Sequence, residues 1–493
     1  MSSQTETLSA PAPSKLREID DLPGPRGLPI VGNMLQIDAP HIHRQVERWT
    51  AEYGPYFRFR LGSRVLFVVA DHAAVGAVFR DRPEGFRRTQ RFGEVASEIG
   101  LVAGVFGAEG DAWRRQRKMV MAGFDPRHLR AYFPSLMKVA GRLEKRWRAA
   151  ARSGTPIDLQ PDLMRFTVDA ISGLAFGADV NTLESNEEVI QSHLDKIFPA
   201  LFRRLMAPLP TWRWWKTAQD RELDRSVAAV GHAIDGFVRD ARARLDADPD
   251  RRAAPHNLLE AMIVAADDPG SGITDAEVSG NVMTMLLAGE DTTANTLAWA
   301  VWLLTRNPEA LGRARAEVDA NSDAAAGWTL ERLAELRYVE ACANETMRLK
   351  PVAPFLMLQA LRETRIADIR VPAGTLVWAG LRTDTLREDY FENATSFSPE
   401  RWLDAHAAPS TTSVNRIAMP FGAGPRVCPG RQLAMLEIKM AMAVLLVGFD
   451  IDSVATASGR EPEERLSFTM APEPLTMRLH VRTTLTETEA AAA

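Results

Sequence analysis

The feature that most constrains the fold of this sequence is one long helical pattern, which runs from Thr274 to Arg306. Thr274 can act as the N-cap, and Glu277, three residues later, can complete a capping box. Asn307-Pro308 ends the pattern after about 32 residues, whereas an ordinary globular helix has roughly 11–12. No run anywhere reaches the roughly 18 apolar residues that a membrane-spanning helix requires. We therefore expect a long helix inside a large folded domain.

The rest of the chain predicts a mainly α fold with small β-sheets. Strand-like patterns occupy 56–61, 65–70, 361–381 and 466–482, and helical patterns fill most of 71–320 and the segment after Cys428 up to about Leu446. A turn at Gly62-Ser63 predicts a hairpin between the first two strands, and Thr329 opens a second predicted capping box. We see no internal repeat and no linker. We therefore expect a disordered leader at 1–21, one domain at 22–482 and a disordered tail at 483–493.

The composition excludes several classes of protein. With 59 basic and 64 acidic side chains in 493 residues, the formal net charge is −5, which argues against a dedicated nucleic-acid binder. Hydrophobic residues are 46% and charged residues 25%, as in ordinary globular proteins, so the chain is neither disordered nor collagen-like. The only cysteines, Cys342 and Cys428, are too few for a disulfide framework or a four-cysteine metal site, and they fit a reducing cytosol.

The loop around Cys428 is the sharpest local signal. It reads Phe421-Gly-Ala-Gly-Pro-Arg-Val-Cys-Pro-Gly430 and is followed at once by a helix. A thiolate at a helix N-terminus is stabilised by the helix dipole and free N–H groups, which could also tune a bound metal. The plain alternative, a buried apolar cysteine, suits Cys342 but does not explain so constrained a loop.

This loop resembles the haem-binding loop of cytochromes P450, Phe-x-x-Gly-x-Arg-x-Cys-x-Gly, at every defined position. The resemblance covers about residues 22–482 and implies the triangular, helix-rich single-domain fold of that family, in the soluble bacterial, long-chain branch that resembles fatty-acid hydroxylases. It implies haem b, with Cys428 as the iron ligand. By the same resemblance, Trp113-x-x-x-Arg117 and Arg426 bind the haem propionates. The full set of cofactor-binding residues implied is Trp113, Arg117, Ala288, Phe421, Gly422, Arg426, Cys428 and Gly430.

Ala288-Gly-Glu-Asp-Thr-Thr293, within the long helix, resembles the oxygen-activation motif of the family. The resemblance implies that Asp291 and Thr292, together with Glu290, form the catalytic proton relay. A general acid must lie within hydrogen-bond reach of the reacting atom, which suits a buried acid beside a hydroxyl. The plain alternative is that these polar side chains face water.

Two further segments resemble the structural core of the family. Glu345-x-x-Arg348 places both side chains on one helix face, where they can pair. Pro399-Glu-Arg-Trp402 resembles the Pro-Glu-Arg-Phe segment and adds Arg401 to the pair, with Trp402 in place of the usual Phe. The implied role is to brace the core beneath the haem.

The resemblance also implies an apolar substrate pocket. Its walls are expected from the long helix, from the segment after Arg348 and from the loop around 86–101, and the Trp-rich stretch 202–216 falls where the family has a mobile lid. Arg64 stands where fatty-acid hydroxylases hold a substrate carboxylate, but Val68 replaces their Tyr, so a solvated strand-end Arg is the plain alternative. The substrate residues expected are Arg64, Phe86, Thr284, Leu287, Ala288, Ala353, Phe355 and Leu356.

The function implied is that of a monooxygenase that inserts one oxygen atom from O2 into an apolar, fatty-acid- or terpenoid-like molecule. Electrons are expected from NAD(P)H through a separate ferredoxin or flavodoxin with its reductase, because the sequence contains no flavin or ferredoxin segment. We expect a cytoplasmic monomer without a membrane anchor or nucleic-acid partner. The alternatives are a P450 peroxygenase or isomerase-type enzyme, whose members typically lack the acid–threonine pair, and a haem-based ligand sensor.

Overall fold

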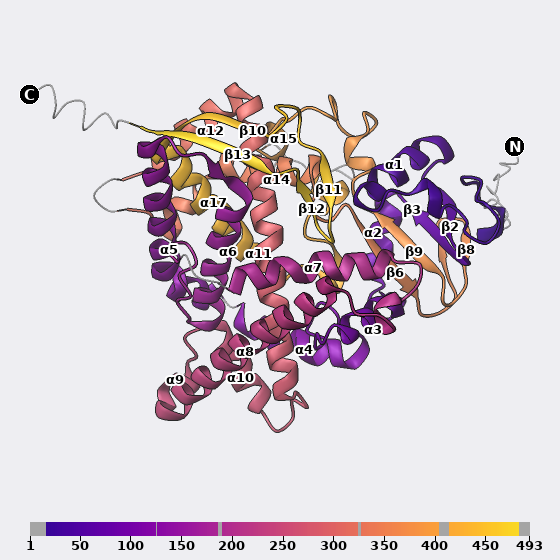
Figure 1. Ribbon diagram of the computed structural model, residues 1–493, viewed down its shortest axis with the longest axis horizontal. Helices are drawn as coiled ribbons and strands as arrows, with labels where there is room; N and C mark the ends of the chain where they lie inside the picture. Colours follow the sequence, from indigo (N-terminus) through magenta and orange to yellow (C-terminus); the bar gives the residue numbers. More distant parts are fainter. Residues whose placement is uncertain (1–15, 125, 186–189, 324–326, 404–413, 483–493) are drawn as a thin grey trace, which may run out of the picture.

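A long central helix, α11 (Asp275–Arg306), organises the structure, a computed structural model that describes residues 16–124, 126–185, 190–323, 327–403 and 414–482. Figure 1 shows α11 crossing the helical part of the molecule, while the largest sheet lies at the N-terminal side. The helix begins at the predicted capping box, where Thr274 accepts a hydrogen bond from the Glu277 N–H and Glu277 bonds back. It ends at Arg306 because α12 (Pro308–Asn321) starts with a proline. Both predicted bounds are confirmed.

The other helices surround α11. It packs mainly against α6 (Leu159–Phe176), and also against α8 (Ala218–Ala247), α14 (Arg337–Leu349) and α17 (Arg431–Gly448). The remaining α-helices are α1 (Ile42–Tyr53), α2 (His72–Arg80), α3 (Gln90–Glu98), α4 (Gly110–Gly123), α5 (Pro126–Ser153), α7 (Ile190–Met206), α9 (Pro249–Ala253), α10 (Leu258–Asp267), α13 (Leu330–Ala334), α15 (Glu400–Leu403) and α16 (Val414–Ile417). In the part of the chain that the structure describes, no helix is both long and apolar enough to cross a membrane.

Four small sheets complete the fold in the described part of the chain. The largest has the order β2-β3-β9-β6-β4, and its β2–β3 hairpin confirms the turn predicted at Gly62-Ser63. The others have the orders β1-β8-β7, β10-β13-β5 and β11-β12. The strands are β1 (Arg17–Glu18), β2 (Tyr56–Leu61), β3 (Arg64–Val69), β4 (Phe86–Arg88), β5 (Ile157–Asp158), β6 (Phe355–Ala360), β7 (Thr364–Ile366), β8 (Ile369–Val371), β9 (Leu376–Gly380), β10 (Phe449–Thr456), β11 (Glu464–Leu466), β12 (Met470–Pro472) and β13 (Leu475–Val481).

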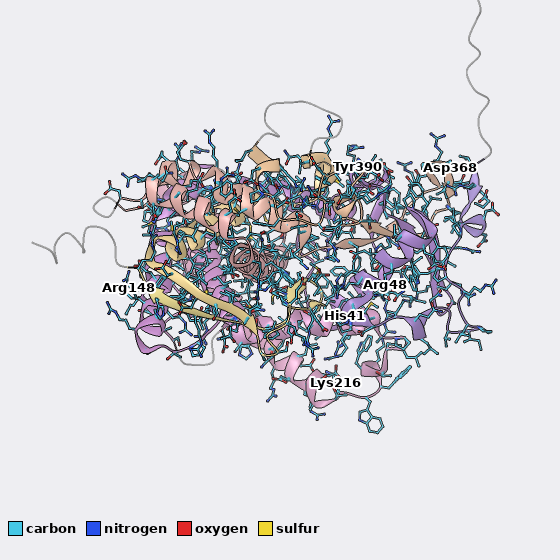
Figure 2. The ribbon with its side chains drawn as sticks, turned by 90° about the horizontal axis from the view of Figure 1, so that it is seen from above. His41, Arg48, Arg148, Lys216, Asp368 and Tyr390 are labelled. Carbon is cyan, nitrogen blue, oxygen red and sulfur yellow. The ribbon has the colours of Figure 1, made fainter. Side chains whose placement is uncertain are left out.

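Two local expectations need correction. Residues 16–21 were assigned to a disordered leader, but β1 pairs in parallel with β8, and Arg17 binds Asp368 with Nε 2.7 Å from Oδ2. Figure 2 labels Asp368 at the end of the molecule opposite Arg148. Residues 1–15 and 483–493 lie outside the described residues. At α13, the Thr329 hydroxyl accepts from the Arg332 N–H, but Arg332 occupies the position where a complete capping box needs Glu or Gln.

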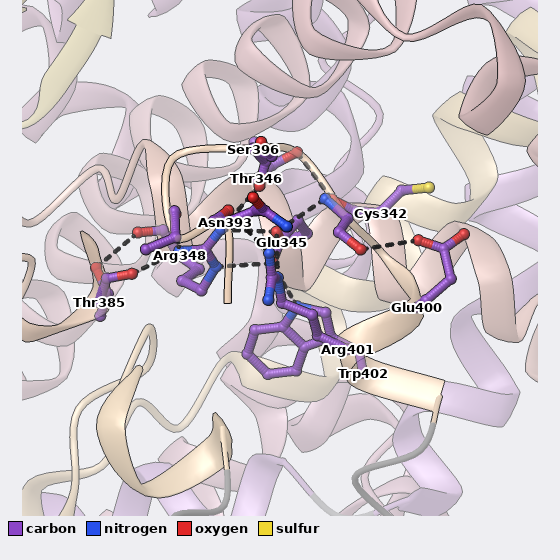
Figure 3. A network of polar contacts seen from close by, with 12 residues as sticks. Cys342, Glu345, Thr346, Arg348, Thr385, Asn393, Ser396, Glu400, Arg401 and Trp402 are labelled. Carbon is purple, nitrogen blue, oxygen red and sulfur yellow. Dashed lines mark hydrogen bonds and ion pairs between the residues drawn. The ribbon is translucent and has the colours of Figure 1, made fainter. Parts of the chain in front are cut away.

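A buried polar network on α14 fastens the segment 385–402 to the helical core (Figure 3). Glu345 and Arg348, both with fully buried side chains, form an ion pair with Nη2 2.7 Å from Oε1. Arg348 also donates to the carbonyl oxygens of Thr385, Ala394 and Ser396. Glu345 accepts from Arg401 and, at 2.9 Å, from the indole N–H of Trp402. The predicted trio therefore meets here, and Trp402 adds a donor that the usual Phe lacks.

Candidate active site

Cys428 lies in a tight loop between the 3-10 turn Gly424–Arg426 and α17. The loop turns sharply because Gly424 has a φ of +70°, and a Cβ there would lie only 2.5 Å from the carbonyl oxygen of Phe79 on α2. The Cys428 N–H donates to the Phe421 carbonyl at 2.9 Å, which closes the loop on itself. The close packing of the loop on α2 therefore explains why the loop needs a glycine at position 424.

The Cys428 thiol is set up to bind a cation. The residue keeps solvent-reachable surface, yet desolvation by the surrounding loop raises the pKa of its thiol. A hydrogen bond from the Gly430 N–H and the nearby charge of Arg117 act in the opposite direction and favour the thiolate. A bound metal ion would deprotonate such a thiol outright. Cys342, by contrast, is buried in the main core, where burial raises the pKa of its thiol well above the usual range.

A cluster of buried arginines lies close to this loop. Arg426 pairs with Glu109, donates to the Ala108 carbonyl at 2.8 Å and lies over the Trp113 ring, 4.6 Å from its centroid. Arg82 is only 4% exposed, and its Nε and Nη2 have no hydrogen-bond partner among the described residues. Burial, and then the neighbouring Arg426 charge, lower the pKa of Arg82 to about 10.

The arginine cluster carries more positive charge than the protein balances. Burial also lowers the pKa of Arg88 well below its usual value, with Arg82 and Arg426 contributing, and Glu109 is the carboxylate that opposes this effect. Buried charges are normally paired. A group with two carboxylates beside a metal that binds Cys428 would satisfy the unpartnered nitrogens of Arg82 and the unpartnered Nε of Arg426. The residues present therefore fit a haem and its propionates.

The acids of α11 have separate partners. Asp291 accepts from Asn295 Nδ2 at 2.8 Å and from the Thr469 hydroxyl, whereas the Thr292 hydroxyl donates to the Ala288 carbonyl at 2.6 Å. Burial raises the pKa of Asp291, and its two hydrogen bonds partly oppose that shift. Glu290 is 2% exposed, so the alternative that all three polar residues face water is wrong for Glu290. Burial raises the pKa of Glu290 well above its usual value, with Asp195 and Asp291 contributing.

The residues expected around the substrate are placed in three different environments. Thr284, Leu287 and Ala288 follow one another along α11, and Thr284 meets the loop at Gly104 so closely that a Cβ there would lie 2.1 Å from its Oγ1. Ala353 precedes β6, whose Leu356 and Phe355 are partly buried, and Phe355 stacks on Trp378 at 3.5 Å between centroids. Phe86 is 2% exposed and packs in the core cluster on the largest sheet. Arg64 is exposed at the start of β3.

An aromatic cluster beside α11 was not foreseen. Phe468 joins β11 to β12 with a φ of +99°, an unusual conformation for a bulky residue. Its ring stacks on Phe198 of α7 at 4.5 Å between centroids and also contacts Phe92 and Phe106. The next residue, Thr469, donates to Asp291, so the β11–β12 hairpin contacts both α7 and α11. No local pattern marks these four phenylalanines, which come from distant segments.

The Trp-rich stretch 202–216 continues from α7 to the outer surface, where Figure 2 labels Lys216. Trp212 donates to Glu98 at 2.7 Å, and Trp214 and Trp215 are 73% and 80% exposed. Arg91 of α3 donates to the carbonyl oxygens of Arg204, Leu205 and Ala207 at the end of α7. The stretch is thus tied to α3 at its base and exposed at its tip.

Comparison with known proteins identifies the family. The family model described as cytochrome P450 matches residues 22–479. Carotene epsilon-monooxygenase, chloroplastic, of Arabidopsis thaliana is 25% identical over 86% of this chain and 78% of its own length. Protein LUTEIN DEFICIENT 5, chloroplastic, from the same plant is 24% identical over 81% of this chain and 67% of its own length. A putative cytochrome P450 of Caenorhabditis elegans, cyp-13B1, is 26% identical over 93% and 94%.

The match extends over nearly the whole chain and includes the cysteine loop, the buried arginines and the acids of α11. Together these findings establish that the chain belongs to the cytochrome P450 family and is a haem-dependent monooxygenase.

Proposed function

We propose that this enzyme binds haem b through Cys428 and hydroxylates long apolar molecules, fatty-acid- or terpenoid-like. When bound, a thiolate-ligated haem supplies the activation of O2 and the oxidation of the substrate. The single observation that carries the cofactor site is the buried Arg82, whose Nε and Nη2 need an anion beside the Cys428 loop. Trp113, Arg117 and Arg426, the residues expected at the propionates, support the same place.

The protein's own contribution is to hold and move protons. The carboxylate of Asp291 is fixed by Thr469 and Asn295, and the Thr292 hydroxyl lies one helical turn from Ala288, whose carbonyl it contacts. We propose that these two groups deliver the protons that the reaction of O2 consumes. Their presence favours a monooxygenase over a peroxygenase or isomerase-type enzyme, and over a ligand sensor, which needs no relay.

A long apolar substrate is supported by the pocket side chains and by one relative. Leu287 and Ala288 on α11, Leu356 on β6 and the phenylalanine cluster around Phe468 are apolar. Apolar pockets with few polar groups bind apolar ligands. The name of the carotene epsilon-monooxygenase of Arabidopsis thaliana refers to such a molecule.

Electrons are proposed to come from NAD(P)H through a separate ferredoxin or flavodoxin and its reductase. Helix α4, which carries Trp113 and Arg117, also exposes Arg115 and Lys118 to solvent. These cations could meet an acidic partner. Arg114 contributes less, because it already pairs with Glu84 and Asp111.

Removal of the Arg82 charge should weaken haem binding. A hydrogen bond to a charged group is worth about 1.5–3 kcal/mol, so Arg82→Gln should release haem roughly 10- to 100-fold faster. The measurement is haem transfer to an excess of an apo-haem acceptor protein. The matched control is Arg87→Gln. The Arg87 guanidinium contacts Gln359, so this change should leave the rate of haem release unaltered. Equal rates of haem release from wild type and Arg82→Gln would show that Arg82 does not contact the haem.

Loss of the Thr292 hydroxyl should uncouple turnover. We expect Thr292→Ala to bind substrate normally but to form roughly 10-fold less product per NAD(P)H, with hydrogen peroxide as the balance, because a general acid is worth about 10²–10⁴-fold. Thr305→Ala is the control, because its hydroxyl also bonds back to a helix carbonyl on α11 but lies far along the helix. Full coupling in Thr292→Ala would refute the relay.

Arg64 should give only a small preference for acids over esters. An exposed Arg–carboxylate contact is worth about 0–1 kcal/mol, so a fatty acid should bind at most about 5-fold tighter than its methyl ester. Binding is followed by the shift of the haem Soret band. Arg64→Ala should abolish the preference, whereas Arg60→Ala, on the neighbouring strand, should keep it. A preference that survives in Arg64→Ala would make a neutral substrate the better choice.

A further inference from the structure

Two carboxyl groups from different helices meet beside the oxygen-activation motif. Glu290 of α11 forms a side-chain hydrogen bond with Asp195 of α7. The two residues differ in exposure: Glu290 is 2% exposed, whereas Asp195 is exposed at the surface of α7. Gln191, one turn earlier on α7, donates to the Asp195 carboxylate, and Thr167 of α6 donates to the Glu290 carbonyl at 3.1 Å. The pair therefore connects a solvent-facing acid with a buried one.

This pair must hold a proton. Two carboxylates in hydrogen-bond contact cannot both be ionised, because their charges repel in a poorly solvated place. Oε1 of the buried Glu290 accepts no hydrogen bond from a donor among the described residues. Asp195 has solvent-exposed surface, but its carboxyl group is desolvated where it meets α11; this desolvation, together with the charge of Asp291, raises the pKa of Asp195 to about 6.

The surrounding cations are engaged elsewhere. Lys196, next to Asp195 on α7, pairs with Glu222 of α8 at 2.8 Å. Arg165 of α6 donates to the carbonyl oxygens of Thr182 and Ser185. Both cations lower the pKa of Asp195 without contacting it, and Asp291 on α11 is the other acid facing the pair. Proton sharing, rather than a salt bridge, therefore stabilises the contact between α7 and α11.

We propose that Asp195 and Glu290 form a proton-loading pair, through which protons pass from solvent to the catalytic acid Asp291. The inference rests on the proposed role of Asp291 and Thr292. In one cycle the O–H bond of Glu290 breaks and an O–H bond forms on the Asp291 carboxylate. A hydronium ion of the solvent then protonates the Asp195 carboxylate and leaves as water, and this proton moves from Asp195 to Glu290. One proton enters and one is delivered, so the charge of the pair is unchanged.

The placement of the pair supports this path. The Asp291 carboxylate accepts hydrogen bonds from Thr469 and Asn295. Neither of these two side chains can supply Asp291 with protons from solvent in every cycle. The hairpin that carries Thr469 is covered by Phe198 of α7, which stacks on Phe468. Asp195 lies one turn before Phe198 on the same helix and is exposed, so it can exchange protons while the aromatic cluster covers the motif.

The first test measures the shared proton without turnover. In the haem-loaded protein at neutral pH, infrared difference spectra between wild type and Glu290→Gln should isolate a protonated-carboxyl band of Glu290 that shifts in D2O. Because burial alone keeps Glu290 protonated, Asp195→Asn should change the position of this band rather than remove it. The control Glu222→Gln, which removes the partner of Lys196, should leave the band in place. A band at the wild-type position in Asp195→Asn would overturn the proton sharing.

Thermal unfolding against pH gives a second readout of the same pair. A carboxyl whose pKa is higher in the folded than in the unfolded protein stabilises the fold at low pH, and this contribution is lost as pH rises through the folded value. The wild-type melting temperature should therefore fall relative to that of Asp195→Asn from about pH 4, the unfolded pKa of Asp, to above pH 6. A constant difference across this range would contradict the proposal.

Turnover separates this inference from the relay itself. Asp195→Asn should slow NAD(P)H-dependent O2 consumption about 10-fold or more and enlarge the solvent isotope effect, yet retain normal product per NAD(P)H, because Thr292 is intact. Thr292→Ala should instead lose coupling. If Thr292→Ala uncouples but Asp195→Asn turns over at the wild-type rate, the loading pair is wrong and the relay stands.

Discussion

The excess of buried positive charge next to Cys428 is the constraint on which the rest of the site depends. Arg82 and Arg88 lie in one short segment, Arg426 comes from a distant part of the chain, and Glu109 is a carboxylate near all three. Burying an unpaired charge is costly, so this arrangement is stable only with an anionic partner. The two propionates of the proposed haem would satisfy that demand beside the Cys428 thiol. The glycine-rich loop then fixes the thiol, because Gly424 allows it to pack directly on α2.

Two kinds of buried polar group occur in this protein, and they have different roles. In the Glu345–Arg348 network every strong donor and acceptor is used within the chain, as Trp402 and three carbonyl groups illustrate. Such a network stabilises the fold and leaves no capacity for chemistry. In Arg82 and Glu290, by contrast, some buried side-chain atoms have no hydrogen-bond partner among the described residues. We propose that the cofactor and the protons of the reaction use these atoms.

Features set by local interactions could be predicted from the sequence. The bounds of α11 follow from Thr274, Glu277 and Pro308, and the hairpin follows from Gly62-Ser63. The Cys428 loop predicted the family because its many fixed positions lie within one short segment. Features set by contacts between distant segments could not be predicted.

Several distant contacts illustrate this limit. The strand β1 exists because it pairs with β8, more than 350 residues later, and its sequence alone looks like part of a polar leader. The burial of Phe86 follows from the pairing of β4 with β6, which are more than 260 residues apart. Arg82, Asp195 and Thr469 belong to no recognisable motif, and only the folded chain shows their neighbours.

The most direct measurement of the central claim is the absorption of the reduced protein with carbon monoxide. Wild type and Cys342→Ser should both show the band position typical of thiolate-ligated haem, and Cys428→Ser should lose it. An unchanged band in Cys428→Ser would contradict the assignment of Cys428 as the iron ligand.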